Sequence, residues 1–197
     1  MRQARFISSS PHYRSLPVSA GKEVAFAGRS NAGKSSVLNT ITGRRALAKI
    51  SSSPGKTRHI NLFGLDEQAV LRLADLPGYG YAKVNVREQK RWGEELTRYV
   101  MERESLCGVV IVVDIRRSLT ENDRQMLTLC RTAGRPVHVL LNKSDKLKKS
   151  MLFRTVRDME KELAFLAPGA SMSSFSALKK TGLPEFYEVL GRWLQLL

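Results

Sequence analysis

Cysteine is scarce in this sequence, and so are long apolar runs. The two cysteines among 197 residues, Cys107 and Cys130, stand in neither a CxxC pair nor a metal-ligand spacing. This argues against a disulfide scaffold and a cysteine-based metal site, and we expect two free thiols in a reducing compartment. The longest apolar run, 108–113, ends at Asp114 and is too short to span a bilayer.

The N-terminal segment lacks the apolar core of a secretory signal, so we expect a soluble, cytoplasmic protein with no stable insertion into a membrane. Acidic residues are also few: 18 Asp and Glu against 33 Lys and Arg give a net charge of +15. An excess this large promotes contact with polyanions such as RNA, ribosomes or an anionic membrane surface. Part of it can simply serve the phosphates of a nucleotide, or solubility.

One loop is bounded by glycines, follows the apolar run 24–27 and leads into a helical pattern. It fits G-x-x-x-x-G-K-[ST], the phosphate-binding P-loop, in which backbone N–H groups and a helix N-terminus face a polyphosphate. Lys34 can reach the β- and γ-phosphates, and the Ser35 hydroxyl can ligate Mg²⁺. The predicted phosphate-binding residues are Gly28, Arg29, Ser30, Asn31, Ala32, Gly33, Lys34, Ser35 and Ser36.

Apolar strands alternate with helical patterns along the rest of the chain, which is typical of βαβ units. We expect strands at 23–28, 59–65, 69–74, 107–115, 136–141 and 171–175, and helices at 34–43, 87–104, 120–132, 148–167 and 183–196. The predicted fold class is α/β: a three-layer P-loop NTPase with a mostly parallel six-stranded sheet flanked by about five helices. Residues 1–22 are predicted to be an N-terminal arm, and 23–197 a single domain.

Three further loops at the ends of predicted strands resemble the other motifs of the small GTPase fold. Asp75-x-x-Gly78 offers a carboxylate for the Mg²⁺ shell and a glycine N–H for the γ-phosphate. Asp145 can accept two hydrogen bonds from the guanine N1–H and exocyclic amine, a pair that adenine does not offer. Asn142 can fix that loop and the Lys143 stem can cover the ring. The residues predicted to bind nucleotide here are Asp75, Leu76, Pro77, Gly78, Asn142, Lys143, Ser144, Asp145, Phe175, Ser176 and Ala177.

Four stretches, GRSNAGKSS, SSSPGKTRHINLF, DLPGYGYAK and NKSD, are similar to those of the EngB (YihA/YsxC-type) bacterial GTP-binding proteins. These belong to the TrmE-Era-EngA-EngB-septin-like GTPase group. The resemblance runs from about Glu23 to the C-terminus. It implies a monomeric GTPase that binds GTP and GDP, is needed for cell division and septation, and takes part in assembly of the large ribosomal subunit.

The same resemblance implies roles for the loops near 44–58 and 78–86 as switches that order on the γ-phosphate. Thr57 would give its hydroxyl to Mg²⁺ and its N–H to the γ-phosphate, so Ser35, Thr57 and Asp75 form the implied metal set. Its neighbours Gly55, Lys56, Arg58 and His59 join the implied nucleotide contacts. The implied catalytic residues are Lys34, Thr57, Gly78 and Asn31.

One departure concerns catalysis: Tyr79 stands where Ras-type enzymes carry the glutamine that orients the attacking water. We therefore expect slow intrinsic hydrolysis that needs a partner or a cation. Asn31 is the residue type with which related GTPases hold K⁺ beside the phosphates. We interpret Tyr79 as a packing residue of the second switch in preference to a catalytic one.

Several alternatives stay open at this stage. The turn 114–117 is either a contact to a partner or the P-loop, or a solvated basic turn. Basic runs at 146–149, 179–180 and 44–45 form either a solvated surface or a footprint for ribosomal RNA. A rival function is a structural protein of the division site whose hydrolysis is incidental. A P-loop kinase or ATPase is disfavoured because Asp145 selects guanine.

Overall fold

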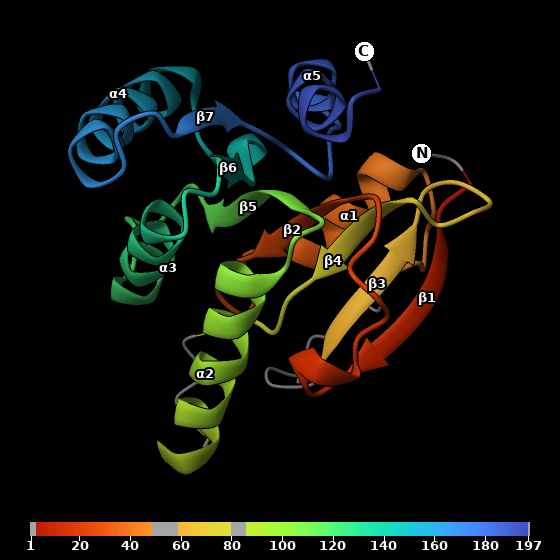
Figure 1. Ribbon diagram of the computed structural model, residues 1–197. Helices are drawn as coiled ribbons and strands as arrows, with labels where there is room; N and C mark the ends of the chain where they lie inside the picture. The colour runs from red at the N-terminus through yellow and green to blue at the C-terminus, as the bar shows by residue number, and fades with distance from the viewer. Residues whose placement is uncertain (1–2, 49–58, 80–85, 197) are drawn as a thin grey trace.

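Seven strands form one sheet within the residues that the computed structural model describes, 3–48, 59–79 and 86–196, and helices cover both of its faces (Figure 1). The strand order is β1-β3-β4-β2-β5-β6-β7. Neighbours from β4 to β7 run parallel, whereas β3 is antiparallel to both β1 and β4. The strands are β1 (Arg5–Ser10), β2 (Lys22–Ala27), β3 (Ile60–Gly64), β4 (Leu71–Asp75), β5 (Leu106–Asp114), β6 (Val137–Asn142) and β7 (Ser171–Ser174).

Five α-helices occur in the same described ranges, together with two short 3₁₀ turns, η1 (Tyr13–Ser15) and η2 (Ser144–Lys146). Thr120, the first residue of the helix predicted at 120–132, is the N-cap of α3: Thr120 and Asp123 form a capping box, each side chain accepting the other's backbone N–H. Gly43 ends the first helix in the left-handed conformation that glycine adopts without strain. The helices are α1 (Lys34–Thr42), α2 (Val86–Glu102), α3 (Glu121–Thr132), α4 (Lys149–Leu166) and α5 (Leu183–Leu194).

Alternate side chains of the central strands build two separate cores. On β5, Val109, Ile111 and Val113 join the core beneath α2, α3 and α4, while Val110 and Val112 join the core beneath α1 and α5. Both sets are buried, which is why this strand reads as a continuous apolar run in the sequence. The predicted α/β class with helices on both faces is confirmed.

The predicted number of strands was six, and the described residues contain seven. The additional strand, β1, lies inside the segment predicted to be an arm, and pairs antiparallel with β3. Most of its side chains are exposed or half-buried, so it carries no apolar alternation that would reveal it. Phe6 packs edge-on against Phe63 of β3, with ring centroids 6.1 Å apart.

The parallel strands deliver the predicted motif loops to one edge of the sheet. β2 leads into the P-loop, β4 ends at Asp75, β5 at Asp114 and β6 at Asn142, while β7 precedes Ser176 by two residues. Carboxyl ends of parallel strands meet at one edge, where α/β proteins bind ligands.

None of the helices in the described ranges is long and apolar enough to cross a membrane.

Candidate functional site

The P-loop, residues 28–35, needs glycine at two positions because of what packs against it. Gly33 has a φ of 97°, and a Cβ built there would lie 2.3 Å from Nδ2 of Asn142. Gly28 has a φ of 149°, and its Cβ would lie 2.5 Å from the carbonyl oxygen of Val112 on β5. Any other residue would strain the backbone and collide with a neighbour. The glycine spacing of the motif thus follows from contacts with β5 and with Asn142 at the end of β6.

Lys34 and Asp75 come together at the start of α1. The Lys34 ammonium donates a hydrogen bond to Oδ1 of Asp75, and both residues are buried, 7% and 3% exposed. Ser35, the next residue of the helix, is half-buried. Hydroxyl and carboxylate oxygens are ligands that Mg²⁺ prefers, so Ser35 and Asp75 fit this ion. Thr57, the third residue of the implied metal set, lies outside the described residues.

Asn142 joins the P-loop to the loop after β7. Its Nδ2 donates to the carbonyl oxygen of Ala32 at 3.0 Å, and its Oδ1 accepts the N–H of Ala177 at 3.2 Å. The residue is 2% exposed, and a buried amide that satisfies groups on two loops fixes their separation. Ser144 adds a main-chain link, its N–H donating to the carbonyl oxygen of Phe175 at 3.0 Å.

A buried hydroxyl stabilises the ionised form of the Asp145 carboxyl. Ser176, which is fully buried, donates to Oδ1 of Asp145 at 2.6 Å. This hydrogen bond, assisted by the nearby Lys146, lowers the pKa of the Asp145 carboxyl below its ordinary value. Lys146 Nζ lies 3.7 Å from the other oxygen, Oδ2. An ionised carboxylate at this place is what recognition of two guanine N–H groups requires.

A cavity of about 570 Å³ opens between these loops, within the range of small-molecule sites in proteins. It reaches from the P-loop to the guanine-motif loop, and basic side chains stand at its rim. The residues that line it are Gly33, Ser36, Asn39, Thr40, Gly43, Arg44, Arg45, Asn142, Lys143, Asp145, Lys146, Ala177, Leu178 and Lys180. Its size and its position between the phosphate and base loops suit a nucleoside.

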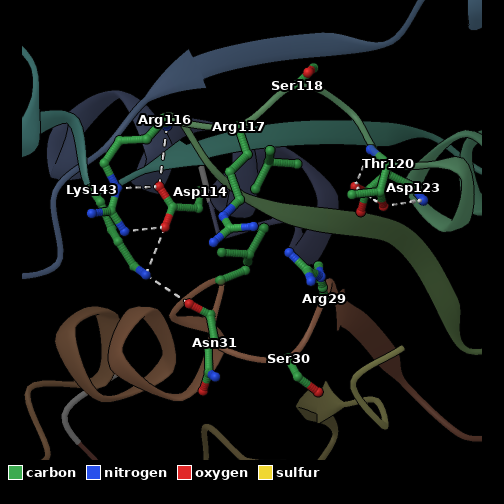
Figure 2. Close-up of a pocket in the computed structure, with 13 residues that line it drawn as sticks. Arg29, Ser30, Asn31, Asp114, Arg116, Arg117, Ser118, Thr120, Asp123 and Lys143 are labelled. Carbon is green, nitrogen blue, oxygen red and sulfur yellow. Dashed lines mark hydrogen bonds and ion pairs between the residues drawn. The ribbon is translucent and has the colours of Figure 1, made fainter. Parts of the chain in front are cut away.

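Lys143 connects the P-loop to the end of β5 (Figure 2). Its Nζ donates to the carbonyl oxygen of Asn31 at 2.7 Å and to Oδ2 of Asp114 at 2.9 Å. Burial favours the neutral acid, yet hydrogen bonds from Arg116 and Lys143 outweigh it and hold the pKa of Asp114 well below its usual range. Asp114 of the turn 114–117 is therefore linked to the P-loop through Lys143, whereas Arg116 and Arg117 are exposed.

The side chain of Tyr79 is held against α3. Its hydroxyl donates to Oδ1 of Asp123 in α3 at 2.7 Å, and its carbonyl oxygen accepts the N–H of Ser30 at 3.2 Å. Burial, with the Asp123 charge beside it, raises the pKa of Tyr79 well above its ordinary value. Gly78 itself lies against Ser30, since a Cβ on it would be 3.1 Å from the Ser30 Oγ. The sequence analysis included Asp123 only within the helix predicted at 120–132 and gave no signal of this contact.

The side chains of several other predicted nucleotide contacts do not face the motif loops. Leu76 and Phe175 are fully buried in the core, so only their main chains face the motif loops. His59 is exposed, and its Nδ1 lies 3.0 Å from the Ser9 hydroxyl of β1. Gly55, Lys56 and Arg58 lie outside the described residues, as Thr57 does.

Comparison with known proteins gives consistent matches. A family model described as "50S ribosome-binding GTPase" matches residues 23–143, and one for the elongation factor Tu GTP binding domain matches 95–196. A protein of Hydrogenovibrio crunogenus named "Probable GTP-binding protein EngB" is 47% identical over 194 residues, covering 98% of this chain and 91% of its own.

Two solved structures show the shared fold. A crystal structure of a probable GTP-binding protein engB superposes with a TM-score of 0.67 and 20% identity, covering 89% of this chain and 99% of its own. Era in complex with MgGDPNP and nucleotides 1506–1542 of 16S ribosomal RNA gives a TM-score of 0.68 and 23% identity, covering 88% and 57%.

We expect the Ser176–Asp145 hydrogen bond to contribute measurably to the affinity for guanine nucleotides. Ser176→Ala leaves the carboxylate short of its buried donor, and hydrogen bonds to charged groups contribute about 1.5–3 kcal/mol. We expect GDP affinity to fall by roughly ten- to a hundredfold in a titration with fluorescent GDP. The unaltered chain should bind equally from pH 6 to pH 8, because the lowered pKa keeps Asp145 ionised there. Ser150→Ala, at an exposed position of α4, is the control, and equal affinities in the two variants would refute the role of Ser176.

Tyr79→Phe separates a packing role from a catalytic one. The change removes the donor to Asp123, so the free energy of unfolding should fall by about 1–3 kcal/mol in urea titrations. The GTP hydrolysis rate should change by less than about tenfold, since general acid–base groups contribute ~100-fold or more. Tyr13→Phe in η1 is the matched control. A hundredfold loss of hydrolysis with unaltered stability would show that the packing interpretation is wrong.

Proposed function

The chain belongs to the EngB family of GTP-binding proteins and carries a GTPase domain, and from this premise we propose that it is a Mg²⁺-dependent switch of large-subunit ribosome assembly. Through that role it would be needed for normal cell division and septation. We place it in the cytoplasm as a monomer. The observation that carries the proposal is Asn142, whose amide ties the P-loop to the loop beside Asp145, so that phosphate and base sites form one cleft.

The phosphate side of the proposal rests on Lys34 and Asp75. Lys34, which donates to Asp75 here, would hold a phosphate oxygen of the nucleotide, and the Asp75 carboxylate would then be free to help hold a metal. Bound Mg²⁺ would neutralise charge on the β- and γ-phosphates, with Ser35, Asp75 and the switch residue Thr57 holding it. Gly78, against the P-loop at Ser30, would offer its N–H to the γ-phosphate.

Hydrolysis is proposed to be slow in the isolated protein. The side chain after Gly78 is Tyr79, and its hydroxyl is engaged by Asp123, so it is not available to orient water. Asn31 is exposed beside the P-loop backbone and is the proposed K⁺ ligand. The implied catalytic set is therefore Lys34, Thr57, Gly78 and Asn31, with the ion completing it.

The partner side of the proposal rests on charge and on family. The net charge is +15, and Arg44, Arg45, Lys146 and Lys180 line the rim of the nucleoside cavity. The matching family model is described as ribosome-binding, and Era was crystallised with both MgGDPNP and a piece of ribosomal RNA. The rival proposal, a division-site protein with incidental hydrolysis, has no feature of the described residues in its favour beyond the same charge.

Sedimentation with ribosomal subunits tests the proposed role. We expect the protein to sediment with the large subunit when it is loaded with a non-hydrolysable GTP analogue, and to remain in the supernatant with GDP. Because phosphate contacts release counterions, binding should weaken steeply as salt rises. Lys34→Ala, which loses the phosphate contact, is the control for nucleotide dependence. Absence of the protein from the pellet in both nucleotide states would refute the ribosomal role and favour the division-site alternative.

Monovalent cations test the proposed role of Asn31. GTP hydrolysis should be at least about tenfold faster in K⁺ than in Na⁺ buffer, because an ion beside the phosphates stabilises transition-state charge. Asn31→Ala should remove the difference while keeping GDP affinity within about threefold. Equal rates in the two buffers, with and without ribosomal subunits, would show that the ion has no part in the reaction.

A further inference from the structure

A second, smaller cavity of about 180 Å³ lies between the P-loop and the loop that follows β5 (Figure 2). Residues 29–32 of the P-loop form one wall, and the end of β5 with residues 116–118 forms the other. Figure 2 shows the side chains of Arg29 and Arg117 extending into this space from the two walls. We call it the Arg29–Arg117 cavity. It shares few residues with the nucleoside cavity.

Both carboxylates that line this cavity are already engaged. Asp114 accepts from Arg116 at 2.9 Å and 2.6 Å, and from Lys143 at 2.9 Å. Asp123 accepts from Thr120 at 2.8 Å and 2.6 Å through Oδ2, and from Tyr79 through Oδ1. The acids are therefore satisfied by groups other than the two arginines that give the cavity its name.

The guanidinium groups of Arg29 and Arg117 form no ion pair with any carboxylate in the part of the chain that the structure describes. Four cationic side chains, Arg29, Arg116, Arg117 and Lys143, line the cavity against two carboxylates, so its walls carry an excess of two positive charges. Like charges that share a confined space repel, and an anion between them relieves the repulsion. At the N-terminus of α3, the N–H groups of Thr120 and Asp123 are already taken by the capping box.

The size and the donors of the cavity define the class of anion. A guanidinium presents its N–H groups as a planar fork that matches two oxygens of a phosphate. A volume of about 180 Å³ is below that of sites that enclose whole small molecules, ~300 Å³ and more, and suits one phosphate group. Arg116, Arg117 and Ser118 are exposed, so a phosphate can enter while the chain that carries it stays outside.

We propose that the Arg29–Arg117 cavity binds one backbone phosphate of an RNA. RNA presents phosphates on a chain that can pass over the exposed residues 116–118, and the net charge of +15 attracts such a polymer. The proposal rests on the proposed function for the identity of that RNA, ribosomal RNA. The phosphate would lie against Arg29, whose backbone pairs with Tyr79, and so against the nucleotide-binding loop itself.

Arg117→Gln is the test variant, because Arg117 belongs to none of the P-loop, metal or guanine contacts. Arg157→Gln, which removes an exposed arginine from α4, is the matched control. Both proteins are loaded with GDP, and binding of a short fluorescein-labelled RNA is followed by anisotropy over a range of salt. We expect Arg117→Gln to weaken binding roughly three- to tenfold and to reduce the slope of log affinity against log salt by about 0.7. GDP affinity should be unchanged, and Arg157→Gln should bind RNA as the unaltered chain does.

The outcomes distinguish an RNA phosphate from the other possible ligands of the cavity. Equal binding of RNA by the two variants would overturn the proposal. A methylphosphonate version of the same RNA, which has no backbone charge, should bind Arg117→Gln and the unaltered chain alike; a persisting difference would overturn the phosphate contact. If orthophosphate shifts the NMR resonances of the Arg29 and Arg117 guanidinium groups but RNA does not, the site takes free phosphate and the RNA assignment is wrong. Since the assay contains no ribosomal subunits, its failure is distinguishable from failure of the ribosomal role.

Discussion

The buried amide of Asn142 is the contact on which the geometry of the site depends. Its two ends bind main-chain groups of Ala32 and Ala177, loops that are far apart in sequence but that must hold the phosphates and the base of one ligand. An amide is the side chain that can donate to one loop and accept from the other. A carboxylate could not donate, and a hydroxyl is too short to span both. The same amide group occupies the space where Gly33 would carry a Cβ, so one contact explains a residue in each motif.

Most buried charged side chains of the described residues have a partner of opposite charge. Glu23, with no exposed surface, accepts from Arg103 at 3.1 Å and from Tyr99, and Lys34 is paired with Asp75. Buried ions need such partners because loss of solvation costs several kcal/mol. The Lys34–Asp75 pair differs from Glu23–Arg103 in its proposed role, in which a phosphate would take Lys34 and a metal would take Asp75. Pairing that a ligand can take over suits a switch.

Prediction from the sequence succeeded for elements that are determined by a single residue type or by a local pattern of apolar residues. The buried run of β5, the helix that begins after Thr120 and the motif loops were predicted from such local signals, and the resemblance to the EngB family is confirmed. It failed where the outcome depends on which elements become neighbours. β1 is fixed by backbone pairing with β3, 50 or more residues away, and the Tyr79–Asp123 bond joins residues 44 apart. No periodicity or motif records such a contact.

The Tyr79–Asp123 bond also limits what the chain can do alone. If the tyrosine turned toward the phosphates, Asp123 would lose a donor in a partly buried place, at a cost of about 1–3 kcal/mol. A second contact, from the N–H of Ser30 to the carbonyl oxygen of Tyr79, holds the main chain of Tyr79 against the P-loop. The side chain after Gly78 is thus stabilised where it cannot orient water. Under the proposed mechanism, the group that completes hydrolysis would reach the P-loop from its exposed side, at Asn31, where an ion or a partner has access.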